Sequence, residues 1–190
     1  AFRAAGSEAI ALEATELIRT DDTFGEANVD FTTTNRLIRE RFAAIPEDQI
    51  VVVTGFIGST PEGVTTTLGR SGSDYTATIL GAALDAELVV IWTDVDGVMS
   101  ADPRLVPEAF VLPHLSYREA AEMAYFGAKV LHPRTMEPLQ AKGIPLRIRN
   151  TLNPGAPGTL ITADAPPPPW YVGAVTAIRD VAVLMLEGAG

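Results

Sequence analysis

The sequence predicts an α/β protein, because short apolar runs rich in β-branched residues alternate with stretches of helical spacing. The runs at 50–54 (IVVVT) and 88–92 (LVVIW) are almost continuously apolar, which is typical of strands buried on both faces. A third run covers 144–148, and a weaker one covers 9–12. We therefore expect strands at these places, with helices between them.

Helix signals lie between the apolar runs. Helical spacing covers 34–44 and, after a glycine-rich turn, 74–84. Ser116 and Glu119 form a capping box, in which each side chain bonds the free backbone N–H of the other residue. Pro133 suits the first turn of a later helix, because a first-turn N–H has no partner to lose.

The 190-residue chain has 14 Lys and Arg against 24 Asp and Glu, a formal net charge of −10. This balance argues against nucleic acid or an anionic membrane surface as the main partner. With 47% hydrophobic and 20% charged residues, the composition is globular. The absence of cysteine excludes disulfides and thiol nucleophiles, and two histidines cannot build a multi-histidine metal site. Without a membrane-length apolar run or a secretory leader, the expected location is cytoplasmic.

A change in composition divides the chain near its C-terminal end. Four consecutive prolines at 166–169 cannot join a helix or the interior of a sheet, so they indicate a semi-rigid linker. Beyond them, 174–186 contains strand-like sequence that is too short to form a core of its own. We expect one domain over 1–162, a linker over 163–171 and the start of a second domain over 172–190.

A glycine-rich region contains the first candidate site. TGFIG follows a predicted strand, and LGRSGSD opens a predicted helix. Glycine allows the backbone to approach a ligand closely, and a helix N-terminus attracts anions. Arg70 could bind a carboxylate or phosphate, and Asp74 could bind an ammonium group. The alternative is that Ser71 or Ser73 only caps the helix while Asp74 complements its dipole.

The second candidate site is TDVDGVMSADPR at 93–104, directly after the run at 88–92. Open α/β sheets bind ligands at this edge, so Thr93, Asp94 and Arg104 could face a nucleotide and its magnesium. The alternative is a plain turn, because Asp-Gly and Asp-Pro are ordinary turn dipeptides. Spacing alone favours the plain turn.

The third candidate site is FGAKVLHPRT at 126–135, where Lys129 could bind a phosphate from a loop. The alternative is an ordinary solvated lysine, which most loop lysines are. His132 and His114 have no second histidine or carboxylate at catalytic spacing, and we interpret both as structural.

The chain resembles the aspartate kinases of the amino-acid kinase superfamily in a series of strings, which are, in order, TGFIG, TPEGVTTTLGRSGSDYTA, WTDVDG, DPR, SYREAAEMAYFGAKVLHPRT and NTLNPGAPGTLI. The similarity covers about 10–161, and GRSGSD and EMAYFGAKVLHP are specific to aspartate kinases. The tail at 174–190 resembles the first strand of an ACT regulatory domain. The resemblance implies an incomplete three-layer αβα sandwich of the amino-acid kinase type, followed by the start of an ACT-like α+β domain.

The resemblance implies transfer of the ATP γ-phosphoryl group, with Mg²⁺, to the side-chain carboxylate of L-aspartate, an early step towards lysine, threonine and methionine. Residues 1–162 would be the C-terminal part of the kinase domain of an allosteric enzyme that dimerises through its ACT region. Arg70 would clamp a carboxylate of aspartate, and Arg104 would contact phosphates. The implied substrate residues are Phe56, Arg70, Ser73 and Asp74, and the implied nucleotide residues are Thr93, Asp94, Met99, Arg104, Lys129 and Val130.

The sequence departs from the family pattern at two points. Met99 stands where the family usually has a tyrosine that helps to hold the nucleotide. The Lys-Phe-Gly-Gly loop and the Gly-Glu segment of the family have no counterpart in this sequence. We therefore expect the chain alone to be inactive. Two alternatives stay open: a non-catalytic regulatory or assembly fragment, and another amino-acid kinase of the same fold.

Overall fold

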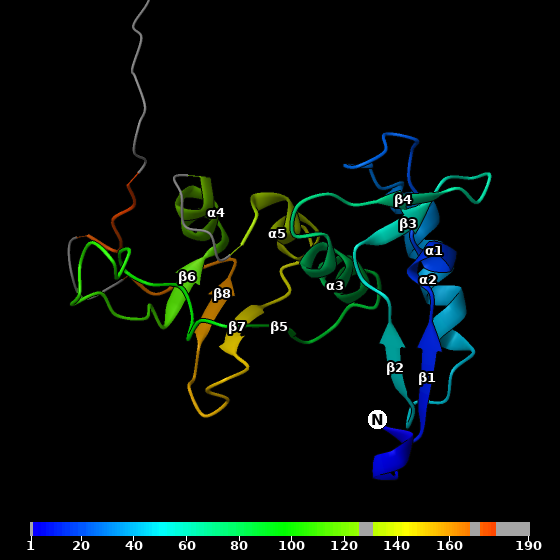
Figure 1. The fold of residues 1–190 in the computed structure, drawn as a ribbon, viewed down its shortest axis with the longest axis horizontal. Coiled ribbons are helices and arrows are strands. Elements are labelled where there is room, and N and C mark those ends of the chain that lie inside the picture. Colours follow the sequence, from blue (N-terminus) through cyan, green and yellow to red (C-terminus); the bar gives the residue numbers. More distant parts are fainter. Residues whose placement is uncertain (1, 126–130, 168–171, 178–190) are drawn as a thin grey trace, which may run out of the picture.

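The structure is a computed structural model that describes residues 2–125, 131–167 and 172–177 (Figure 1). In chain order the elements are η1 (Arg3–Ala5), β1 (Ala9–Leu12), α1 (Ala14–Leu17), α2 (Phe31–Ala43), β2 (Ile50–Val53), β3 (Ile57–Ser59), β4 (Thr65–Thr67), α3 (Gly72–Ala83), β5 (Val89–Thr93), β6 (His114–Ser116), α4 (Tyr117–Tyr125), α5 (Pro133–Gln140), β7 (Leu146–Asn150) and β8 (Thr159–Thr162). The α/β class predicted from the sequence is confirmed.

The elements lie in two groups with α3 between them (Figure 1). One group contains β1 to β4 with α1 and α2, and its apolar cluster includes Leu17, Ile38 and Ile79. The other contains β5 to β8 with α4 and α5, and its cluster includes Leu139 and Leu146. Because α3 also packs against α5, it joins the two groups into one body.

β1 and β2 form a parallel pair that begins with Ala9 opposite Ile50. Val51 and Val53 pack against the first apolar cluster, whereas Ile50 is 38% and Val52 is 44% exposed. The prediction that this run is buried on both faces is therefore wrong. Successive side chains of a strand point to opposite faces, and no described element covers the second face of β2.

Local hydrogen bonds set the beginnings of two helices. α2 begins at Phe31, because the Asp30 carboxylate accepts a hydrogen bond from the Thr33 backbone N–H at 3.2 Å. The capping box of α4 is confirmed. Glu119 Oε2 accepts the Ser116 backbone N–H at 2.7 Å, and Ser116 Oγ accepts the Glu119 N–H at 3.2 Å.

The second group contains a four-stranded mixed sheet in the order β5-β7-β8-β6. β5 and β7 are parallel, β7 and β8 are antiparallel, and β8 and β6 are parallel. The runs predicted at 88–92 and 144–148 are confirmed as β5 and β7, shifted by one or two residues. Burial on both faces is wrong for the ends of the first run, because Leu88 and Trp92 are exposed. The short strands β3, β4, β6 and β8 were not predicted, because their glycine, threonine and serine content gives them no apolar run.

The described residues after the proline run form no strand, so the strand expected from 174 is absent over 174–177, and 178–190 lie outside the described residues. The Val175 backbone N–H instead donates to the Ser100 carbonyl at 2.8 Å. Within the described ranges, no helix combines the length and the apolar character needed to cross a membrane.

Candidate functional site

The N-terminus of α3 follows the glycine-rich turn directly. Ser71 occupies the N-cap position in the left-handed conformation (φ 55°), and its side chain makes no capping hydrogen bond. The alternative in which Ser71 caps the helix is therefore wrong. Ser73 is exposed in the first turn, where backbone N–H groups and the positive end of the helix dipole favour an anion.

Phe56 is held against this helix end by its backbone. Its N–H donates to Thr76 Oγ1 at 3.0 Å, and Thr76 Oγ1 donates to the Gly72 carbonyl at 2.9 Å. A Cβ on Gly72 would lie 2.5 Å from Phe56 Cδ2, and a Cβ on Gly55 would lie 3.0 Å from Ser73 Cβ. Glycine is needed at both positions because the chain before β3 packs directly on α3. Phe56 and Ser73 are thus brought to one place.

Asp74 and Arg70 place opposite charges at the same turn. Asp74 is half-buried in the first turn of α3, and this burial raises the pKa of its carboxyl above the ordinary value. Arg70 is exposed on the turn that leads into the helix. An amino acid carries both an ammonium and a carboxylate, so a carboxylate and a guanidinium on one turn suit such a ligand.

A loop at 21–28, which no sequence pattern indicated, lies beside the turn. A Cβ on Gly69 would lie 3.0 Å from Glu26 Cγ. The Asp21 carboxylate accepts hydrogen bonds from the Asn28 backbone N–H (2.8 Å) and side-chain amide (2.7 Å), which lower the pKa of Asp21 to about 2. Arg134 reaches this loop from α5, with its guanidinium 3.8 Å from the Glu26 carboxylate. These contacts hold the loop over the turn.

The expected nucleotide residues begin where β5 ends. Thr93 is the last residue of β5, and its Oγ1 donates to the Asp94 carboxylate at 3.2 Å. Asp96 Oδ1 accepts from the side-chain amides of Asn150 (2.8 Å) and Asn153 (3.1 Å). The carboxyl ends of β5 and β7 are therefore linked at the sheet edge where α/β proteins bind ligands.

The loop at 94–106 contains three of the expected nucleotide residues, and we call it the nucleotide loop. Thr159 on β8 fixes its position. Its Oγ1 accepts the Val98 N–H at 2.8 Å and donates to the Leu112 carbonyl at 2.7 Å. Gly97 has a φ of 148°, and a Cβ there would lie 2.5 Å from Thr159 Oγ1. The Asp-Gly pair at 96–97 is therefore part of a packed loop rather than a free surface turn.

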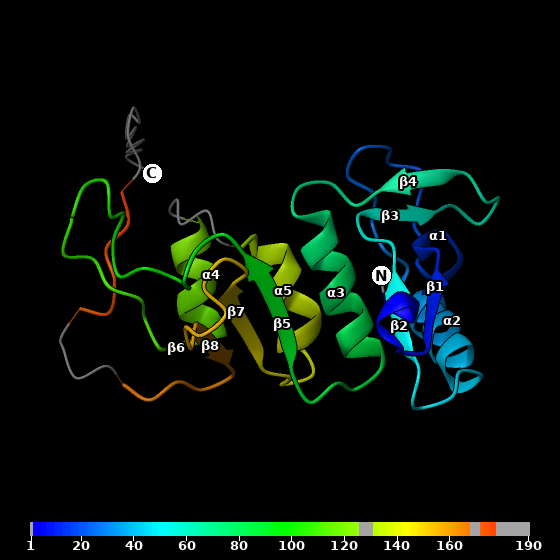
Figure 2. The same ribbon diagram turned by 60° about the horizontal axis from the view of Figure 1, so that its bottom comes forward.

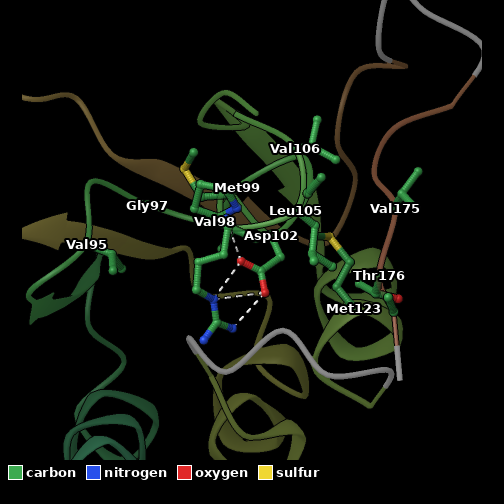
Figure 3. Close-up of a pocket in the computed structure, with 14 residues that line it drawn as sticks. Val95, Gly97, Val98, Met99, Asp102, Leu105, Val106, Met123, Val175 and Thr176 are labelled. Carbon is green, nitrogen blue, oxygen red and sulfur yellow. Dashed lines mark hydrogen bonds and ion pairs between the residues drawn. The ribbon is translucent and has the colours of Figure 1, made fainter. Parts of the chain in front are cut away.

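The loop lines an apolar cavity of about 350 Å³, a volume at the lower end of small-molecule sites (Figure 3). Met123 from α4 forms another part of its wall. Residues from three parts of the chain line it, namely Val95, Gly97, Val98, Met99 and Ala101 to Val106 from the loop, Met123 from α4, and Val175, Thr176 and Ala177 after the proline run.

Among the described residues that line the cavity, Arg104 carries the positive charge. Its Nη2 lies 2.7 Å from Asp102 Oδ2, and its Nε lies 3.0 Å from Asp102 Oδ1 (Figure 3). The Asp102 carboxylate raises the pKa of the Arg104 guanidinium. Because the Arg104 side chain is 80% exposed, a phosphate can reach it from solvent.

The two groups of expected residues lie at the same side of the molecule. Figure 2 shows the tip of β5 and the start of α3 pointing to the same side. The structure brings Met99 and Arg104 to the cavity and places Thr93 and Asp94 at the strand end beside it. Lys129 and Val130 lie outside the described residues.

No sequence pattern indicated the residues that hold the loop at 94–106. Asn150 and Asn153 belong to the string NTLNPG, whose amide side chains after a strand were the available signal. Thr159 gave no signal, because a lone buried threonine looks like any strand residue. Among the described residues, no three His, Cys, Asp or Glu side chains cluster as metal ligands.

The model of the amino acid kinase family matches residues 1–150, and the chain belongs to this family. Within it, the chain is similar to aspartokinases. It is 47% identical over 172 residues to the chloroplastic bifunctional aspartokinase/homoserine dehydrogenase 2 of Arabidopsis thaliana, covering 87% of this chain and 18% of that protein. It is 44% identical over 156 residues to lysine-sensitive aspartokinase 3 of Escherichia coli, covering 82% and 35%.

The solved structure of E. coli aspartokinase III in complex with aspartate and ADP (R-state) superimposes with a TM-score of 0.84 at 41% identity. The match covers 90% of this chain and 38% of that one. The predicted amino-acid kinase fold is therefore confirmed. The chain spans between about a fifth and two fifths of the length of these relatives.

Proposed function

We propose that the complete gene product containing these 190 residues is an aspartate kinase, which transfers the ATP γ-phosphoryl group to the side-chain carboxylate of L-aspartate. The observation that supports this most is the pairing of two sites at one side of the fold. One is the charged turn at the start of α3, and the other is the cavity beside β5. The aspartokinase relatives support the choice of aspartate as acceptor.

In the reaction, an oxygen of the aspartate carboxylate bonds to the γ-phosphorus while the bond from that phosphorus to the β,γ-bridging oxygen breaks. The products are aspartyl phosphate and ADP. The attacking carboxylate is already ionised at neutral pH, so the protein needs to position it and neutralise charge rather than remove a proton. This demand fits a site that offers helix N–H groups and guanidinium groups.

Each substrate residue would bind a different group of the aspartate acceptor. Arg70 binds a carboxylate of aspartate, and the Asp74 carboxylate accepts hydrogen bonds from its ammonium group. The exposed Ser73 and the first-turn N–H groups of α3 hold the remaining oxygen atoms. Phe56, fixed by Thr76, covers the apolar part of the ligand.

The nucleotide residues would act from the other side. The base enters the apolar cavity against Met99, and Arg104 exchanges its Asp102 partner for a phosphate. Thr93, Asp94, Lys129 and Val130 keep the nucleotide roles that the resemblance implies. The exposed Asp94 carboxylate would hold Mg²⁺, which prefers one or two carboxylates, and the ion would supply positive charge against the phosphates.

We extend the proposal to the organisation of the whole protein. Residues 1–162 contribute the C-terminal part of the kinase domain, 163–171 are the linker, and 172–190 begin an ACT domain that regulates and dimerises the enzyme. The product enters lysine and threonine biosynthesis.

The test is ATP-dependent formation of aspartyl phosphate by the complete gene product, with glutamate as the competing acceptor. Arg70→Ala should lower kcat/KM for aspartate by about 1.5–3 kcal/mol, roughly 10- to 150-fold, the contribution of a charge-assisted hydrogen bond. Arg36→Ala is the matched control, because Arg36 pairs with Glu40 on the surface of α2.

Unchanged aspartate kinetics in Arg70→Ala would remove Arg70 from the site. A preference for glutamate would favour another amino-acid kinase. Aspartate binding without turnover by the complete gene product would favour the non-catalytic alternative; the 190 residues alone are proposed to lack turnover in any case.

A further inference from the structure

The cavity beside β5 has a wall that the nucleotide loop does not supply. Val175, Thr176 and Ala177 line it from a segment that follows the proline run (Figure 3). The Val175 backbone N–H donates to the Ser100 carbonyl at 2.8 Å, and Ala174 packs against the apolar cluster beneath. The segment at 172–177 is therefore attached to the loop both by its backbone and by packing.

This attachment lies next to the expected nucleotide residues. Ser100 directly follows Met99, and Ala101 to Val106 continue the same wall towards Arg104. A planar base in the cavity would contact the loop on one side and the 175–177 segment on another. Within the described residues, Met123 is the other contributor from outside the loop.

We propose that the segment at 172–177 is a wall of the nucleotide-base site, so that nucleotide binding and docking of this segment stabilise each other. The proposal rests on the proposed function, because it takes the ligand of the cavity to be ATP. Coupling of this kind is reciprocal: if the docked segment strengthens ATP binding by some factor, ATP strengthens docking by the same factor.

The segment at 172–177 carries no charged side chain, so an introduced charge should disturb this coupling. Its side chains at the cavity are apolar or hydroxyl groups, which suit a base whose faces are apolar. Val175 is 60% exposed but also lines the cavity, so a carboxylate there would place a charge at the edge of the apolar wall, at a cost that falls on the bound state. A carboxylate at Val172, three positions earlier and 63% exposed, would stay in water outside the cavity lining.

The experiment compares Val175→Asp with the matched control Val172→Asp in the complete gene product. MgATP affinity is measured by calorimetry, and the KM for aspartate is measured in the kinase assay. Val175→Asp should weaken MgATP binding by about three- to tenfold, because the partly exposed carboxylate keeps much of its hydration, with an aspartate KM within about twofold of the parent. Val172→Asp should leave both values unchanged.

Amide hydrogen exchange separates a wall that contacts the nucleotide from a segment that only stabilises the fold, because only the former responds to MgATP. MgATP should slow amide exchange across 172–177 in the parent and in Val172→Asp, and should lose this effect in Val175→Asp. The parent could bind MgATP while the two variants bind it equally well and amide exchange at 172–177 does not change with nucleotide. That result would refute the proposed wall and leave the proposed kinase function intact. If the parent binds no MgATP, both proposals fail.

Discussion

The turn before α3 and the loop after β5 are held in place by contacts of different range. In the turn, the Phe56 N–H bonds Thr76, 20 positions away along the chain. In the loop, the Val98 N–H bonds Thr159, 61 positions away, and Ser100 is bonded by Val175 from beyond the proline run. The proposed acceptor turn is thus held to α3 by a short-range contact, and Arg134 reaches the neighbouring loop at 21–28, whereas the proposed nucleotide loop is itself held by the C-terminal part of the chain.

The largest expected effect comes from disturbing the strand that holds the loop. Gly158 has a φ of 74°, and a Cβ there would lie 1.9 Å from the Ile148 carbonyl oxygen. Gly158→Ala should destabilise the protein by about 3 kcal/mol, because both the conformation and the space forbid a side chain. Thermal denaturation should show a melting temperature lower by about 6–12 °C.

Gly155→Ala is the control for this change, because nothing lies within 4 Å of a Cβ at Gly155. Equal melting temperatures for the two alanine variants would show that the close approach of Gly158 to β7 does not stabilise the fold.

A smaller effect is expected from Thr159→Val, which keeps the shape and removes the hydroxyl. The Val98 N–H and the Leu112 carbonyl would both lose a buried partner, at a cost of about 2 kcal/mol. MgATP affinity should fall with the melting temperature, while the aspartate KM should not change. Thr162→Val is the control, because its hydroxyl makes an exposed, local hydrogen bond to the Asp164 carbonyl. A change in aspartate KM as large as the change in ATP affinity would contradict the separation of the two sites.

The smallest effect separates two carboxylates on the acceptor side by their pH dependence. Burial raises the pKa of Asp74, so its stabilising contribution is present below its ordinary value of 3.8 and is lost as the pH rises. Hydrogen bonds lower the pKa of Asp21 to about 2, so its contribution is present above 3.8 and is lost as the pH falls through 2.

At neutral pH, Asp74→Asn should therefore melt higher than the parent and Asp21→Asn should melt lower, and both differences should vanish in acid. Melting temperatures between about pH 2 and 7 test this. Shifts of the same sign in the two variants would contradict the assigned environments. Asp74→Asn should also weaken aspartate binding, so the charge at Asp74 would serve the ligand at the expense of the fold.

Local patterns in the sequence predicted local structure. The capping box at Ser116 and Glu119 depends on spacing within one helical turn, and it formed as predicted. The run at 9–12 became β1 with the same bounds. The start of α2 was placed three residues late, although Asp30 followed by Thr33 is itself a cap signal. Spacing over a few residues therefore gives helix ends and strand positions.

Contacts between distant parts of the chain were beyond such patterns. An apolar run does not show which face will be covered, so the exposure of Ile50 and Val52 went unpredicted. The hold of Thr159 on Val98 joins residues with no periodic relation. The position of the turn before α3 was therefore predicted, whereas the loop at 21–28 beside it and the cavity with its wall at 175–177 appeared only in three dimensions.

The attachments of Thr159 and Val175 have a consequence for how the chain moves. They bind the nucleotide loop at Val98 and Ser100, so two separate positions of the C-terminal part of the chain are attached two residues apart on one loop. If the hydrogen bond from Val175 to Ser100 breaks, the Thr159 attachment keeps the segment near the loop at an effective concentration on the order of millimolar, so the segment rebinds quickly. A signal arriving from beyond Ala177 would then change the fraction of time for which the segment at 172–177 is docked, in a graded way.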